Sequence, residues 1–255
     1  MIKIGDYVSR KSYNNDVIFE VIGIDKDICK LRGVDFRLLA DAPLKDLVLC
    51  ERGKCDNFCP IIDNSLERDE FFYMPGKILH IDGDKSYLDR CMDFYKKNNV
   101  KAIGKSIKES DMSSMIYKYL TEYNPDILVI TGHDAFLKKG LYKNSQNFCK
   151  TVIEARKYEK SSDKLVIIAG ACQSDYTSLL KSGSTYASSP KKINIHALDP
   201  AIIATSISLL DRNKFCDLKT LLSKTKYGKD GIGGLICKGT MYTGYPRSES
   251  WTYLK

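Results

Sequence analysis

Two apolar runs decide the fold, and each ends in a chemically reactive residue. The first is DILVITGHD (residues 126–134), and the second is KLVIIAGACQS (residues 164–174). Both runs are rich in β-branched residues and lack alternating polar side chains, which is typical of strands buried on both faces of a parallel sheet. His133 follows the first strand, and Cys172 follows the second.

From about residue 76 onward, the chain alternates apolar strands with segments of helical spacing. Leu88, Met92 and Tyr95 recur at helical intervals, and Pro125 ends the following helix. This alternation indicates a mostly parallel sheet with helices on both faces, in which sites form just beyond the carboxyl ends of the strands. The expected strands are 77–83, 100–103, 126–132, 164–171 and 185–188 with an edge strand at 233–238, and the expected helices are 86–97, 112–123, 145–159, 173–181, 200–210 and 218–226.

The first 50 residues have a different pattern and predict a small β module. Four or five short strands in about 50 residues indicate an SH3-like β-barrel, a kind of domain that serves binding or tethering more often than catalysis. Residues 51–75 are polar and turn-rich, and we interpret them as a linker. The expected organisation is therefore an SH3-like module (1–50), a linker (51–75) and an α/β domain (76–255); the expected strands of the module are 4–8, 17–24, 28–33 and 36–40.

Composition excludes several classes of protein. With 255 residues, 43% hydrophobic and 28% charged, the chain can build one or two domains with full cores and is not disordered. No apolar run reaches the ~18 residues that span a membrane, and the N-terminus has no signal core, so we expect a soluble cytosolic protein. The net charge of +8 is spread along the chain, which favours acidic partners or a solvated surface and argues against nucleic acid.

His133 and Cys172 form a candidate catalytic pair. Cys172 follows His133 by 39 positions, which accommodates one loop, one helix and a return strand, so adjacent parallel strands would place both residues at one edge of the sheet. A free thiol has a pKa of ~8.5, and a neighbouring imidazole favours the thiolate and can later protonate a leaving amine. The backbone N–H groups of Cys172 and Asp134 could receive an oxyanion, and the N-terminus of the next helix would favour negative charge.

Other interpretations of these residues stay open. Cys172 could be a small core residue, and His133 could be a strand-end histidine held only by hydrogen bonds. His196 follows Cys172 in the chain, and a Cys-then-His order suits an amidase-type hydrolase, although GACQS (170–174) lacks the second glycine of a G-x-C-x-G elbow. We interpret His196 as structural or part of a substrate loop, and His80, inside a strand, as a core residue.

The nine cysteines indicate neither a disulfide framework nor a strong metal site. Thiols stay reduced in a cytosolic chain. Cys50, Cys55 and Cys59 have C-x4-C-x3-C spacing without a fourth ligand nearby, whereas structural zinc sites use four ligands. Residues 231–234 (GIGG) fit a turn before an edge strand better than a phosphate loop. We therefore expect no metal and no cofactor.

Several contiguous segments resemble the family of sporulation-specific proteases called YabG, found in spore-forming Firmicutes. The resemblance implies a cysteine endopeptidase made in the mother cell that processes spore coat and cortex-associated proteins. It therefore implies a location in the mother-cell cytoplasm and then in the spore coat. The segments that carry the resemblance are IGDYVSRKSY (4–13), MPGKILHIDGD (74–84), PDILVITGHDA (125–135), AGACQS (169–174), ASSP (187–190) and NIHALDP (194–200).

The pair is also similar to the dyad of the caspase–gingipain–clostripain clan, in which His ends one strand and Cys ends the next. This similarity implies a caspase-like (Rossmann-like) three-layer domain. Cys172 would form a thioester, His133 would act as general acid and base, and the N–H groups of Cys172 and Asp134 would stabilise the oxyanion. The clan usually has Gly after the catalytic His, where this chain has Asp134.

In that clan the residue that selects the acyl-side side chain often follows the first strand. We therefore expect Asp84 or Asp82 to line a pocket for Arg or Lys, because a carboxylate accepts a bidentate guanidinium. The alternative for Asp84 is a helix cap. Ser188 and Ser189 follow a later strand and are expected to bind substrate backbone.

Further expectations concern the linker and two rival functions. Arg52 and Arg68 offer basic sites at which the enzyme could cut itself. One rival is an amidase-type Cys hydrolase that uses His196. The other is a non-enzymatic protein of coat assembly or nucleic-acid binding that uses the SH3-like module and the basic charge. The sequence leaves the substrates, the cleavage motif and the oligomeric state open.

Overall fold

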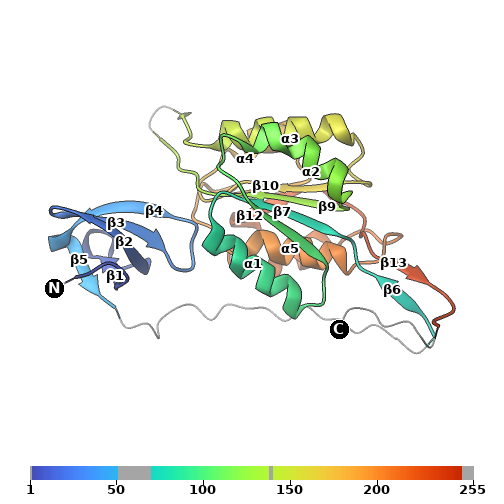
Figure 1. Ribbon diagram of the computed structural model, residues 1–255, viewed down its shortest axis with the longest axis horizontal. Coiled ribbons are helices and arrows are strands. Elements are labelled where there is room, and N and C mark those ends of the chain that lie inside the picture. Colours follow the sequence, from blue (N-terminus) through green and yellow to red (C-terminus); the bar gives the residue numbers. More distant parts are fainter. Residues whose placement is uncertain (1, 51–69, 138–139, 249–255) are drawn as a thin grey trace.

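The computed structural model describes residues 2–50, 70–137 and 140–248. It contains an antiparallel sheet near the N-terminus and a larger, mostly parallel sheet with helices on both faces (Figure 1). Arg52, Cys55, Cys59 and Arg68 lie outside the described residues, so self-cleavage and metal binding in the linker stay predictions. No described helix is long and apolar enough to cross a membrane.

The N-terminal sheet has five antiparallel strands in the order β4-β3-β2-β1-β5. Alternate residues such as Phe19, Val21 and Leu31 are buried, because side chains of a strand point to opposite faces in turn. The β pattern predicted for this region is confirmed, whereas closure into an SH3-like barrel stays a prediction. The elements are β1 (Tyr7–Arg10), β2 (Phe19–Asp25), β3 (Ile28–Gly33), β4 (Leu39–Pro43) and β5 (Leu47–Leu49), with short 3-10 helices η1 (Lys11–Tyr13) and η2 (Leu44–Asp46).

The larger sheet has six strands in the order β12-β11-β10-β9-β7-β8. All neighbouring pairs are parallel except the edge strand β12, which is antiparallel to β11. The α/β class with a mostly parallel sheet is therefore confirmed, and the caspase-like fold stays a prediction. The strands are β7 (Ile78–Asp82), β8 (Ala102–Ser106), β9 (Ile127–Thr131), β10 (Val166–Ala169), β11 (Tyr186–Ser188) and β12 (Ile232–Gly234).

Helices cover both faces of this sheet, and each face has its own apolar cluster. In β9, Ile127 and Val129 pack on one side and Leu128 and Ile130 on the other, so a continuous apolar run serves two cores. The first side carries α1 (Lys85–Lys97), α5 (Asp199–Ser208) and α6 (Leu218–Ser223) with the 3-10 turn η5 (Gly228–Asp230), and the second carries α2 (Met112–Tyr123), α3 (Ser145–Tyr158) and α4 (Tyr176–Lys181).

The two sheets meet through residues 34–38, which join β3 to β4 and are called the docking segment below. The backbone of Phe36 forms an antiparallel bridge with His196, and the N–H of Ala197 donates to the carbonyl of Asp35 at 2.8 Å. The strand expected at 36–40 is therefore wrong at its start, because β4 begins only at Leu39.

Separately, β6 (Phe72–Met74) and β13 (Tyr242–Gly244) form a two-stranded ribbon (Figure 1).

Candidate active site

The structure places His133 and Cys172 at the same edge of the larger sheet. β9 and β10 are adjacent and parallel, with Ile130 opposite Ala169. The chain leaves both strands at the carboxyl edge, where His133 and Cys172 follow within three residues. The turn that carries Cys172 needs Gly170, whose φ is +109°, because most side chains avoid this conformation.

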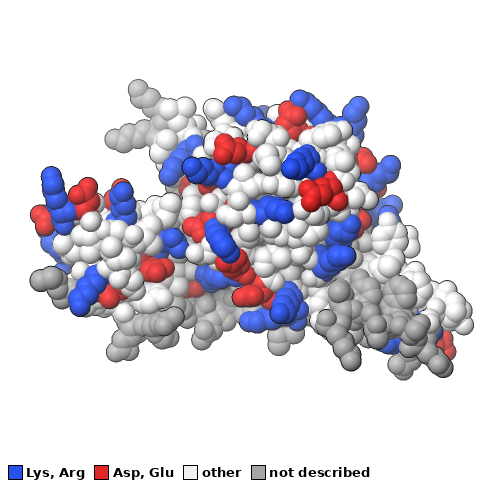
Figure 2. All heavy atoms as spheres, in the orientation of Figure 1, with Lys and Arg blue, Asp and Glu red and all other residues white. Residues whose placement is uncertain are grey.

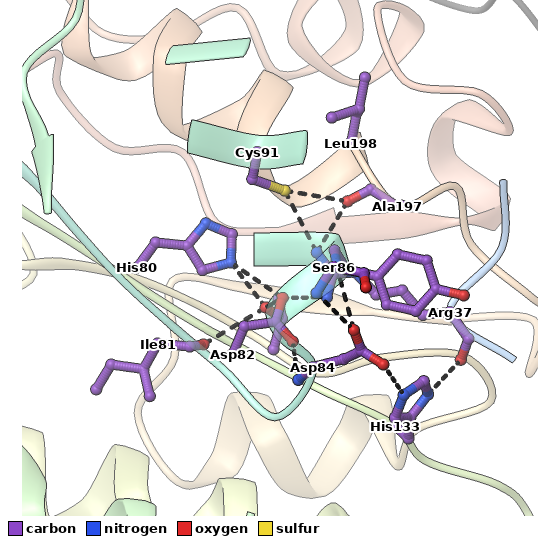
Figure 3. Close-up of polar contacts among 12 residues, drawn as sticks. Arg37, His80, Ile81, Asp82, Asp84, Ser86, Cys91, His133, Ala197 and Leu198 are labelled. Atoms are coloured by element: carbon purple, nitrogen blue, oxygen red, sulfur yellow. Dashed lines mark hydrogen bonds and ion pairs between the residues drawn. The ribbon is translucent and has the colours of Figure 1, made fainter. Parts of the chain in front are cut away.

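His133 is held on three sides. Its backbone N–H donates to Oε1 of Glu109 at 2.9 Å. Its ring has Nδ1 at 3.3 Å from the carbonyl oxygen of Arg37 and Nε2 at 3.2 Å from Oδ2 of Asp84 (Figure 3). The ring also lies edge-on to Tyr87, with centroids 5.7 Å apart. Each ring nitrogen thus faces an oxygen that accepts hydrogen bonds, and neither is directed at a thiol.

Cys172 is completely buried, at 0% exposure. Its Sγ lies 3.8 Å from the carbonyl oxygen of Ile195, and the backbone of Arg37 lies near enough to influence the pKa of the thiol. Burial raises the pKa of Cys172 to about 12, although the Ile195 and Arg37 backbones and the Arg37 charge oppose this shift. The thiol is therefore protonated at neutral pH in this conformation.

The helix after Cys172 does not supply the stabilisation that we expected. The sequence predicted a helix from residue 173, but α4 begins at Tyr176 and has only six residues. The side chain of Asp175 caps its N-terminus by accepting from the N–H of Ser178. The Asp175 carboxylate already occupies the N-terminus of α4. The expectation that this helix stabilises a Cys172 thiolate is therefore wrong.

Asp134 organises the loops around the site through its carboxylate. Oδ1 accepts from the N–H groups of Ala135 and Asn144 at 2.9 and 2.7 Å, and Oδ2 accepts from the hydroxyls of Ser145 and Ser174. Within the described parts of the chain, the backbone N–H groups of Asp134 and Cys172 donate to no other residue. Both donors thus stay available for an oxyanion.

Asp82 lies at the end of β7, is 0% exposed and pairs with an arginine of the chain itself. Nη1 of Arg37 binds its Oδ2 (Figure 3). The same oxygen accepts from Oγ1 of Thr131 at 2.8 Å. The N–H of Asp84 donates to its Oδ1 at 2.9 Å. Burial alone would raise the pKa of Asp82, but the Arg37 guanidinium, the His80 ring and the N–H of Asp84 hold it well below its usual range.

Asp84 has two structural tasks. One oxygen caps α1 by accepting from the N–H groups of Ser86 and Tyr87, so the capping alternative is confirmed. The other oxygen lies 3.2 Å from Nε2 of His133 and 3.7 Å from Nε of Arg32. Burial opposes ionisation, but these partners outweigh it and lower the pKa of Asp84. The carboxylate therefore orients the imidazole.

Ser188 and Ser189 are buried behind the Cys172 turn. Oγ of Ser189 accepts from the N–H of Gln173 at 3.0 Å and lies 3.1 Å and 2.7 Å from the carbonyls of Ala171 and Ile193. In this conformation Ser189 shapes the turn that carries the nucleophile candidate. A contact of either serine with substrate stays a prediction.

The other two histidines are buried. His80 lies between the hydroxyls of Tyr95 and Thr131, at 2.9 and 2.7 Å, and burial lowers its pKa, so it is the core residue that we expected. Nδ1 of His196 accepts from the N–H of Leu198 at 3.2 Å. No group of three metal-ligating side chains occurs among the described residues, which include Cys50.

Three residues that contact the site were not predicted from the sequence. Arg37 and Tyr87 carried no local signal, because their partners lie on other elements. Glu109 left an indirect one: a Cβ on Gly83 or Gly132 would lie 2.3 or 2.6 Å from its Oε1. Glycines that precede Asp84 and His133 can therefore mark the close approach of another side chain.

The comparisons with known proteins agree with each other. The family model described as YabG peptidase U57 matches residues 3–59 and 61–246. The chain is also 38% identical over 283 aligned residues to the sporulation-specific protease YabG of Bacillus subtilis (strain 168). That alignment covers 96% of this chain and 98% of the relative.

Proposed function

Because the chain belongs to the YabG family of sporulation proteases, we propose that it is a cysteine endopeptidase with Cys172 as nucleophile and His133 as general acid and base. One observation carries the proposal. The adjacent strands β9 and β10 bring the two residues to one edge of the sheet, where the Arg37 carbonyl lies beside the His133 ring and the Arg37 backbone influences the pKa of Cys172. Nδ1 of His196 already accepts from the backbone N–H of Leu198, which favours His133 as the partner.

The reaction follows from these groups. His133 takes the thiol proton, and Sγ of Cys172 attacks the scissile carbonyl carbon. The N–H groups of Cys172 and Asp134 receive the negative oxygen of the tetrahedral intermediate. The C–N bond then breaks, His133 protonates the departing amine, and a thioester remains on Cys172. Water, deprotonated by His133, hydrolyses the thioester and restores the thiol. Asp84 keeps the imidazole oriented during both steps.

The proposed specificity is cleavage after arginine or lysine. The carboxylate of Asp84 lies beside His133, and Asp82, two residues earlier in the chain, binds a guanidinium in this structure. A peptide panel with Asp82→Asn and Asp84→Asn tests this point. We expect Asp82→Asn to lower cleavage after arginine more than cleavage after other residues. Unchanged preference in both variants would contradict the proposal.

The proposed substrates are spore coat and cortex-associated proteins, met in the mother cell and then in the coat. On the face shown in Figure 2, Lys and Arg side chains are interspersed with Asp and Glu, which suits contacts with several protein surfaces better than a phosphate backbone. Self-cleavage at Arg52 or Arg68 would show as bands that form in the wild type and are absent from Cys172→Ala.

The decisive experiment incubates purified protein with coat extract and maps the new N-termini. Cys172→Ala and His133→Ala should lower cleavage by roughly 10³-fold or more. Cys149→Ala, which removes a half-buried thiol from α3, is the matched control and should cleave like the wild type. Loss of cleavage in His196→Ala but not in His133→Ala would favour the amidase-type arrangement. Full cleavage by Cys172→Ala would refute a thiol mechanism.

A further inference from the structure

The docking segment (residues 34–38) lies against the candidate site as a bound peptide would. Phe36 forms an antiparallel bridge with His196, and the N–H of Ala197 donates to the carbonyl of Asp35. The hydroxyl of Tyr87 donates to the carbonyl of Phe36 at 2.7 Å. Backbone pairing of this kind recognises an extended chain whatever its side chains are.

The side chain of Arg37 fills a pocket built by the larger domain. The guanidinium binds Asp82 through Nη1, and Nη2 donates to the carbonyl of Ala197 at 3.0 Å and approaches Sγ of Cys91 at 3.4 Å (Figure 3). Its Cζ lies 5.2 Å from the ring centroid of Tyr87. A carboxylate, a carbonyl and an aromatic face together match a guanidinium, whereas the single ammonium of lysine could use only part of the set.

The backbone of Arg37 lies at the two catalytic candidates. Its carbonyl oxygen is 3.3 Å from Nδ1 of His133, and its backbone lies near enough to the Cys172 thiol to influence the pKa of that thiol. The residue on the acyl side of a scissile bond would occupy this position. The carbonyl is directed at His133, however, and His133 therefore cannot accept the thiol proton while the segment is docked.

From this geometry, and resting on the proposed function, we propose that the docking segment is an internal substrate-like inhibitor, with Arg37 in the pocket that selects arginine in substrates. The segment belongs to the N-terminal sheet, so movement of that sheet opens the site. An external peptide with arginine on the acyl side competes for the same pocket. The N-terminal module thereby controls access to Cys172.

Anchors outside the catalytic pair allow a clean test. Arg90 on α1 binds the carbonyl of Val34 and lies 3.3 Å from Oδ1 of Asp35, so Arg90→Ala loosens the segment without touching Cys172, His133 or Asp82. Lys85→Ala is the matched control, because Lys85 lies on the same helix and, among the residues that the structure describes, pairs with Asp89 alone, one turn away. Arg37→Ala is a second variant that empties the pocket itself.

Two measurements test the inhibitory role of the docking segment separately from the peptidase activity. The first is alkylation of Cys172 by iodoacetamide, followed by mass spectrometry, and the second is kcat/KM on a short peptide with arginine at the cleavage site. In Arg90→Ala and Arg37→Ala, we expect both to rise roughly tenfold or more, because a larger fraction of molecules is open. Lys85→Ala should match the wild type. The acetylated peptide Val-Asp-Phe-Arg, which copies residues 34–37, should slow alkylation of Arg90→Ala.

Alkylation that rises while no variant cleaves any peptide would support the docked inhibitor and refute the peptidase. Cysteine-dependent cleavage with the same rate and the same alkylation in all variants would refute the inhibitor and keep the peptidase. Release of a fragment that ends at Arg37 from the wild type, and not from Cys172→Ala, would also overturn it, because the segment would then be a substrate.

Discussion

The buried pair of Arg37 and Asp82 should dominate the stability of the docked arrangement. Both side chains are 0% exposed, and the pair joins the N-terminal sheet to the end of β7. Asp82→Asn keeps the shape of the side chain but leaves a buried guanidinium without its counter-charge. Removal of one partner from such a pair costs about 3–5 kcal/mol. Since a domain is typically stable by about 5–15 kcal/mol, this loss is large.

The assay is urea unfolding at pH 7, followed by far-UV circular dichroism, for Asp82→Asn, Arg37→Met and the double variant. The double variant should lose less stability than the sum of the single variants, because it leaves no unpaired charge in the core. Lys85→Ala, which breaks a pair that is 75% and 58% exposed, should change the unfolding midpoint little.

The pH dependence provides an independent check. The pKa of Asp82 is lowered in the folded state. The stability that the Asp82 carboxylate contributes is therefore fully present above its pKa in the unfolded chain, about 3.9, and is lost as the pH falls toward its pKa in the folded protein. The difference between wild type and Asp82→Asn should therefore shrink in acid. The predicted coupling of Arg37 and Asp82 would be refuted if each single variant lowered the free energy of unfolding by less than about 1 kcal/mol. It would also be refuted if the double variant lost the sum of the two single losses.

Three other perturbations have defined outcomes. Gly170→Ala should lower the free energy of unfolding, measured in urea, by about 1–3 kcal/mol, because the residue has a φ of +109° and its new Cβ would lie 2.9 Å from Leu179. Gly5→Ala is the control and should cost less, because Gly5 has a φ of +91° but open space around it. Burial raises the pKa of Asp199 to about 6, so thermal stability should fall as the pH rises from about 4 to 6, and Asp199→Asn should remove this slope. Tyr87→Phe removes the hydroxyl that binds the docking segment and should speed alkylation of Cys172, whereas unchanged alkylation would count against that role.

Most of the larger sheet could be predicted because its signals are local. The runs that became β9 and β10 are almost wholly apolar, and a strand buried on both faces favours that pattern; β7 is equally buried although it carries His80 and Asp82. Helix α2 begins and ends at Met112 and Tyr123 as expected. The predicted helix at 173–181 was wrong at its start, since Gln173 has a φ of 56° and Ser174 is tied to the turn by the N–H of Ala171.

The sequence by itself determined the class of the fold, the two strand ends with His133 and Cys172, and the resemblance to the YabG family. Only the tertiary structure decided what surrounds them. Arg37 lies 45 positions before Asp82 and 96 before His133, in the segment that joins two strands of the other sheet. No local pattern can announce such a contact, because a buried charge is stable only where a distant counter-charge is brought to it. That pairing brings the docking segment against the candidate site.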